Sequence, residues 1–60
     1  MKNRMSVAMT AELMGVSQDF IRMGLKNNVF PFGYAVKMSE KWTYYISPVK
    51  FQQYTGIQVL

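Results

Sequence analysis

The 60-residue sequence contains no cysteine and no histidine. Disulfides, thiol nucleophiles, zinc fingers and imidazole general bases are therefore excluded together. The three carboxylates fall in different predicted elements, and the chain has no glycine-rich phosphate loop. We accordingly expect a protein that is not an enzyme and that binds no metal and no cofactor.

Long hydrophobic runs are also missing. No apolar stretch reaches 18 residues, and residues 1–15 lack the continuous apolar centre of a signal peptide. We expect a soluble, cytoplasmic protein that does not bind a membrane. Half of the residues are nevertheless hydrophobic, so one small domain over residues 1–60 can bury a dense core.

Acidic residues are scarce. Seven lysines and arginines stand against three aspartates and glutamates, which gives a formal net charge of +4. A nucleic acid would suit this charge, although small basic proteins without an anionic partner are equally compatible with it.

Only four glycines are present, and Gly15 follows an apolar, helix-like run in the stretch AELMGVS, residues 11–17. Glycine readily adopts the left-handed conformation that ends a helix, and Ser17 is a strong N-cap, so a second helix can begin almost at once. Val16 is expected to fill the space between the two helices. The stretch therefore predicts a tight corner between helices.

The first helix is predicted over residues 7–14, capped by Ser6, with one buried face at the i, i+4 and i+7 positions Val7, Ala11 and Met14. The second is predicted over residues 17–27, with Ile21 and Leu25 on its buried side. Asparagine tolerates the left-handed conformation, so the pair at 27–28 is expected to end this helix.

Residues 32–46 change to a period of two, which predicts a β-hairpin. If the apolar residues of both strands share one face, the opposing pairs are Met38 with Trp42, Val36 with Tyr44, and Tyr34 with Ile46. This register leaves residues 39–41 as a three-residue loop. It places on the opposite face Ala35, Lys37, Thr43 and Tyr45.

A last helix is predicted over residues 47–55. Ser47 is placed as its N-cap, Pro48 as its first helical residue and Gly56 just after its end. Ile46 and Phe51 have the spacing of a hydrophobic staple across the start of this helix. After a basic lead-in at residues 1–5, the order is thus a helix-turn-helix over 6–28, a hairpin over 32–46 and a short helix.

This order predicts an α+β fold of the small winged helix-turn-helix type, with the hairpin as the wing. In a helix-turn-helix, a small residue in the first helix lets the second approach, and a glycine four positions later makes the turn. Ala11 and Gly15 have this spacing. Val16 and Ile21 stand where apolar residues lock the two helices together.

The chain also resembles the small winged helix-turn-helix proteins of the excisionase and MerR-like group. The resemblance covers residues 5 to about 55 and rests on the corner at 11–17, Phe30-Pro31, Trp42 and Ser47-Pro48. It implies an excisionase-like accessory factor of a phage or integrative element. Such factors bind double-stranded DNA beside an attachment site, bend it and bias an integrase toward excision.

The helix at 17–27 is expected to enter the major groove. Gln18, Arg22 and Lys26 form an i, i+4, i+8 stripe, in which Gln18 can read adenine and Arg22 can reach guanine or a phosphate. Ser17 could hold a phosphate at the helix start. A solvated polar face and simple capping are the alternative interpretations of the same residues.

On the hairpin, Lys37 and Lys41 are expected to reach flanking phosphates or the minor groove, with solubility and edge protection as the alternative. The full set of predicted DNA-binding residues is Ser17, Gln18, Asp19, Arg22, Met23, Lys26, Lys37, Ser39 and Lys41.

Among the large apolar residues, Trp42 and Phe30 are predicted to be core and Phe32 to be partly exposed. The methionines are expected to fill the core, apart from Met23 on the outer helix face. Copies of the protein are expected to associate side by side on DNA. The predicted protein-interface residues are Tyr45, Phe51 and Tyr54, together with the apolar tail at 57–60.

Three functions remain open from the sequence. The first is the excisionase-like role with an integrase as partner, and the second is a small phage transcriptional regulator that uses the same fold at a promoter. The third is a protein-interaction adaptor on a winged-helix scaffold. The thin basic face and the outward-facing aromatic residues favour the adaptor.

Overall fold

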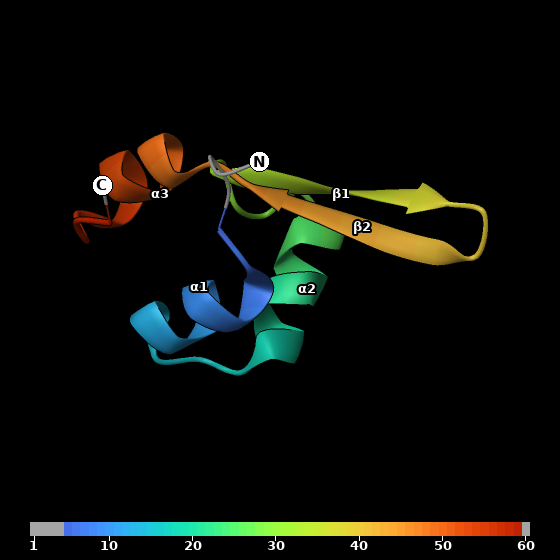
Figure 1. Ribbon diagram of the computed structural model, residues 1–60, viewed down its shortest axis with the longest axis horizontal. Coiled ribbons are helices and arrows are strands. Elements are labelled where there is room, and N and C mark those ends of the chain that lie inside the picture. The colour runs from blue at the N-terminus through green and yellow to red at the C-terminus, as the bar shows by residue number, and fades with distance from the viewer. Residues whose placement is uncertain (1–4, 60) are drawn as a thin grey trace.

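The computed structural model describes residues 5–59, and its order of elements confirms the predicted fold. Helices α1 (Val7–Met14) and α2 (Gln18–Lys26) are followed by an antiparallel hairpin of β1 (Gly33–Met38) and β2 (Lys41–Ile46), and then by α3 (Pro48–Thr55). In Figure 1 the hairpin extends past α2 on one side, while α3 lies at the opposite end of the molecule. This is the α+β arrangement of a small winged helix-turn-helix.

Serine side chains define where all three helices begin. The hydroxyls of Ser6, Ser17 and Ser47 each accept a hydrogen bond from the backbone N–H three residues along, at 3.0, 3.1 and 3.3 Å. Each bond satisfies one of the N–H groups that a helix leaves free at its N-terminus. The three predicted N-caps are confirmed.

The corner between α1 and α2 is formed as predicted. Gly15 ends α1 in the left-handed conformation, with φ of 72°. The N–H of Val16 donates to the carbonyl of Ala11 at 3.0 Å, and the Val16 side chain packs against the core. At the far end of α2, Asn28 takes a left-handed φ of 57°, as expected for an asparagine at that position.

The hairpin differs from its prediction by one residue in register. Tyr34 opposes Tyr45 and Lys37 opposes Trp42, so the turn contains only Ser39 and Glu40, and Lys41 already belongs to β2. Cross-strand partners share a face. One face therefore carries Gly33, Ala35, Lys37, Trp42, Tyr44 and Ile46, and the outer hairpin face carries Tyr34, Val36, Met38, Lys41, Thr43 and Tyr45.

The core lies where the two helices, the base of the hairpin and α3 meet. Its fully buried apolar side chains are Ile21, Leu25, Phe32, Ile46 and Phe51. The rings of Phe30 and Phe32 stack at 4.9 Å between centroids, and Phe51 meets Phe32 edge-on at 5.1 Å. Aromatic packing of this kind supplies much of the buried area available to so short a chain.

Several predicted burial states are wrong. Phe32 is buried rather than partly exposed, and Trp42 is 40% exposed rather than core. Met9 and Met38 are also exposed, so the methionines do not all fill the core. Conversely, Met5 of the predicted basic lead-in is buried, and its N–H donates to the carbonyl of Ile46 at 3.1 Å. Residues 1–4 of that lead-in lie outside the described residues.

Candidate nucleic-acid interface

The polar stripe of α2, defined as Gln18, Arg22 and Lys26, lies at the surface and is internally bonded. Arg22 Nη1 donates to Asp19 Oδ1 at 2.8 Å, and Arg22 Nη2 donates to Gln18 Oε1 at 3.0 Å. The Arg22 side chain remains 38% exposed. The guanidinium is therefore accessible but is held along the helix, and the Asp19 carboxylate partly compensates its charge.

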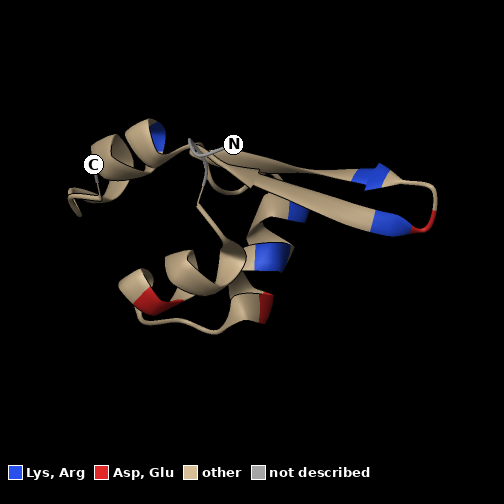
Figure 2. Ribbon diagram, in the orientation of Figure 1, with Lys and Arg blue, Asp and Glu red and all other residues tan. Residues whose placement is uncertain are grey.

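The C-terminal end of the stripe is placed against the hairpin. The Nζ atom of Lys26 lies 4.9 Å from the ring centre of Trp42, a cation–π arrangement. Lys37 is the cross-strand partner of Trp42 and shares its face. Three cations, Arg22, Lys26 and Lys37, thus border the angle between α2 and the hairpin, and Figure 2 shows basic positions on both elements.

The other predicted hairpin residues are not brought to this angle. Lys41 opposes Met38 and lies on the outer hairpin face. Ser39 stands in the turn, beside the exposed carboxylate of Glu40. Lys50 belongs to α3, which lies at the opposite end of the molecule from the hairpin tip (Figure 1). The structure therefore gathers only part of the positive charge into one surface.

The remaining predicted residues of α2 lie around its exposed end. The Ser17 hydroxyl is engaged as the N-cap, which agrees with the capping interpretation. Asp19 carries the acceptor for Arg22, and its side chain is 90% exposed. Met23 is 55% exposed, on the side of the helix away from Ile21 and Leu25.

An apolar strip, defined as Phe20, Met23 and Val29, runs along the flank of α2 that faces away from the polar stripe. These side chains are 54%, 55% and 63% exposed and line a shallow groove with Asp19, Gly24 and Phe30. The Phe30 ring covers Gly24 so closely that a β-carbon there would lie 2.6 Å from Phe30 Cδ2. Glycine at this position allows the ring to close the groove floor.

Sequence reasoning identified Met23 in this strip but missed Phe20 and Val29. A signal for Phe20 exists in the sequence: it lies next to Ile21 and three positions before Met23. At 3.6 residues per turn, Phe20 therefore shares the exposed flank with Met23 rather than the buried line of Ile21. Val29 lies beyond the helix end, where periodicity no longer indicates which side faces solvent.

The predicted protein-interface residues have different outcomes. Phe51 is fully buried, so its prediction as a contact residue is wrong, whereas Tyr54 is 56% exposed. Tyr45 is half-buried against Tyr34, with ring centroids 5.2 Å apart. Ile57 and Val59 of the tail pack partly against the core, and Leu60 lies outside the described residues.

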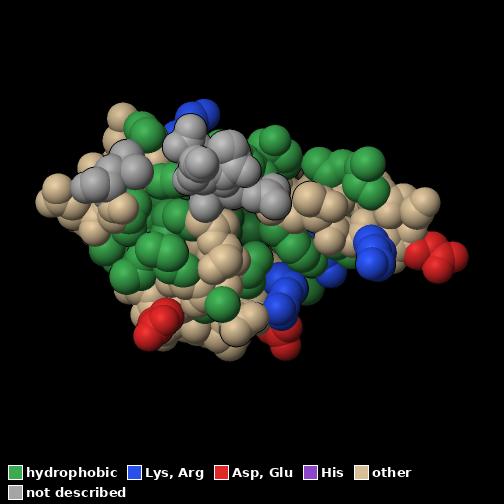
Figure 3. All heavy atoms as spheres, viewed as in Figure 1, with side chains coloured by type: hydrophobic (Ala, Val, Ile, Leu, Met, Phe, Trp, Pro, Cys, Tyr) green, Lys and Arg blue, Asp and Glu red, His purple; other side chains and the backbone are tan. Residues whose placement is uncertain are grey.

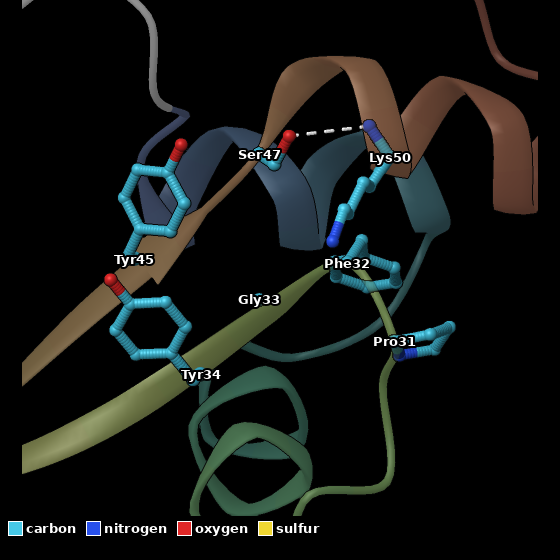
Figure 4. Close-up of a pocket in the computed structure, with 7 residues that line it drawn as sticks. All are labelled: Pro31, Phe32, Gly33, Tyr34, Tyr45, Ser47 and Lys50. Carbon is cyan, nitrogen blue, oxygen red and sulfur yellow. Dashed lines mark hydrogen bonds between the residues drawn. The ribbon is translucent and has the colours of Figure 1, made fainter.

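A second hollow opens at the base of the outer hairpin face. Figure 4 shows the Tyr34 and Tyr45 rings beside each other, with the Lys50 side chain extending toward Phe32 on the far side of the hollow. Figure 3 shows apolar side chains at the surface over the helices and along the hairpin. The outer hairpin face carries the exposed side chains of Tyr34, Val36 and Met38, so it is more apolar than a solvated wing requires.

Comparison with protein-family models, with curated proteins and with solved structures finds no match for this chain. Within residues 5–59, no helix is long and apolar enough to span a bilayer, and no group of three or more acidic, cysteine or histidine side chains is placed to hold a metal ion. The function is therefore inferred from the fold and from these surfaces.

Proposed function

We propose that this protein binds double-stranded DNA as a winged helix-turn-helix module, with α2 in the major groove and the hairpin along the neighbouring backbone. The observation that best supports this proposal is the orientation of α2. The Gly15 corner directs Ile21 and Leu25 into the core while Gln18, Arg22 and Met23 stay at the surface. A recognition helix requires this division between a buried and an accessible side.

The basic groups at this surface predict a modest affinity. Arg22, Lys26 and Lys37 provide three phosphate contacts, so log affinity should fall with log salt at a slope of about −2.7. One module of this size buries only roughly 600–1,000 Å² of its surface on DNA. We therefore propose that several copies bind side by side, with Tyr54 available for contact between them.

The biological role that we propose is that of an excisionase-like factor acting with an integrase. Its support is the sequence resemblance carried by the corner at 11–17, Phe30-Pro31, Trp42 and Ser47-Pro48. A weak module that acts in several copies is suited to such an accessory role, since a partner on the same DNA adds to the total affinity.

A salt titration on a random-sequence duplex tests the proposal. The binding slope of the native chain is compared with that of Lys37→Ala and of Lys50→Ala, which remove the same charge from the proposed interface and from α3. Lys37→Ala should make the slope shallower by about 0.9, and Lys50→Ala should leave it unchanged. Equal changes in the two variants, or no binding by the native chain at tens of micromolar, would contradict the proposal.

A protein-interaction adaptor is the second candidate, because the apolar strip and the outer hairpin face are exposed and Asp19 compensates Arg22. Absence of any duplex binding at low salt would favour the adaptor. The partner would then bind through apolar contacts, and its affinity would change little between low and high salt.

A further inference from the structure

The arrangement around α2 bears on which bases the proposed interface would read, an inference that rests on the proposed function. The polar stripe runs along one flank of the helix and the apolar strip along the other, with Met23 at the accessible side between them. A helix inserted into the major groove along this side would present Phe20 and Met23 to base edges together with Gln18.

Arg22 is poorly prepared to read guanine. Bidentate recognition of guanine uses the forked donors of a guanidinium. Here one N–H of Nη1 and one N–H of Nη2 are bonded to Asp19 and Gln18, which holds the fork along the helix surface, and three of the five N–H donors remain beyond these two bonds. Turning the fork toward a base would break both bonds and leave the Asp19 carboxylate facing the DNA without its partner. The pair therefore favours phosphate contact or a positioning role for Arg22.

Gln18 retains the groups needed for adenine. Its Oε1 accepts one hydrogen bond from Arg22, and a carbonyl oxygen has a second lone pair. The bond from Arg22 also fixes which end of the amide faces the helix. A glutamine amide held in this way matches the donor and acceptor pattern of adenine in the major groove.

We infer that α2 reads A·T base pairs, with Gln18 on adenine and with Met23 and Phe20 against the C5-methyl group of thymine. That methyl is the apolar group that base pairs present in the major groove, and it would cover side chains that are more than half exposed in the free protein. The cations Arg22 and Lys26 lie on the opposite flank of the same helix, where they favour a polyanion, and Asp19, which lines the groove of the strip, is paired with Arg22.

Four alternating duplexes of equal length separate the contributions: A·T, A·U, G·C and G·5-methyl-C. Uracil lacks only the thymine methyl, and 5-methylcytosine restores a methyl at the same place in a G·C pair. At about 50 mM salt, the native chain should bind A·T about fourfold more tightly than A·U for each contacted methyl. It should also prefer G·5-methyl-C to G·C by a similar factor.

Met23→Ala should reduce the ratio of A·T to A·U affinity toward one, and Phe20→Ala should reduce it in part. Met9→Ala is the matched control, because Met9 is an exposed methionine on α1, and it should keep the native ratio. Circular dichroism melts of the variants verify that all three substitutions leave the fold intact.

The outcomes distinguish this inference from the proposed function. Duplex binding without any preference for thymine over uracil overturns the inference and leaves the proposed function in place, whereas no binding to any of the four duplexes overturns the proposed function and the inference with it. A thymine preference that survives both Met23→Ala and Phe20→Ala overturns the assignment of these side chains. The inference is also overturned if the native chain sediments as a dimer without DNA and the Met23→Ala variant sediments as a monomer. The apolar strip would then be the contact surface between two copies of the chain.

Discussion

The two ends of the β-hairpin are held by different interactions. At the base, Ile46 is fully buried, and the N–H of Ser47 donates to the carbonyl of Phe32 at 2.8 Å. At the tip, Met38 is 59% exposed and the chain reverses through only Ser39 and Glu40. The base therefore belongs to the core, whereas the tip depends on its own turn and on cross-strand pairs.

The base and the tip should therefore affect different properties: the base affects the stability of the domain, and the tip affects the contacts that the hairpin makes with a partner. Elements with few buried contacts open at lower free energy than core elements, so substitutions at the tip should alter how the hairpin meets a partner without unfolding the domain. Substitutions at the base should unfold the domain as a whole. The contrast can be tested along the length of the hairpin.

The largest effect is expected from Phe32→Ala at the base. The Phe32 ring contacts Phe30 and Phe51 and is fully buried, and truncation of a core phenylalanine costs about 3–5 kcal/mol. A chain of this length has a total stability of roughly 3–9 kcal/mol. The variant should be largely unfolded at room temperature by far-ultraviolet circular dichroism.

Phe20→Ala is the matched control for this prediction, since the same side chain is removed where it is 54% exposed. Its cost should be about 1 kcal/mol or less, because exposed positions lose little burial. Equal melting temperatures for the two variants would mean that Phe32 is not part of the core that supports the hairpin.

A smaller effect of opposite sign is expected at the tip. Ser39 has a φ of 60°, and the left-handed conformation costs a residue with a β-carbon about 1–2 kcal/mol. Ser39→Gly removes this strain and adds some unfolded-state entropy, so the net gain should be about 0.5–1 kcal/mol in urea denaturation. Glu40→Gly, where φ is not positive, should instead lower stability; a gain there too would argue against the observed turn.

Local rules explain which parts of the fold could be predicted. The start of each helix depends on one serine, and the corner on Gly15, so neighbouring residues contain the whole signal. The hairpin register depends on which residues the rest of the molecule covers. The prediction assumed that Tyr34, Val36 and Met38 face the core, but the helices cover only the base of the hairpin, on the face of Ala35 and Tyr44.

In the candidate site, too, only the features that local rules determine could be predicted. The spacing of Gln18, Arg22 and Lys26 placed them on one flank of α2, because helical periodicity alone determines that placement. The acceptors of Arg22 and the stacking of Lys26 on Trp42 depend on rotamers and on the position of the hairpin. Phe51 stands between the polar residues Lys50 and Gln52, so the sequence does not indicate that it is buried. Its burial follows from the packing of α3 against Phe32.

An effect as small as the one at the tip is expected between the base and the tip, where Lys26 meets Trp42. An exposed cation–π pair contributes about 0.5–1 kcal/mol, so Lys26→Met and Trp42→Leu should couple by about that amount in a double-mutant cycle measured by urea denaturation. Lys26→Met retains the apolar stem of the side chain, so the cycle isolates the charge. Lys50→Met in the same cycle should show no coupling. If the effects of the two substitutions on the free energy of unfolding are additive, the direction of the hairpin is set at its base alone. The angle between α2 and the hairpin could then widen when a partner binds.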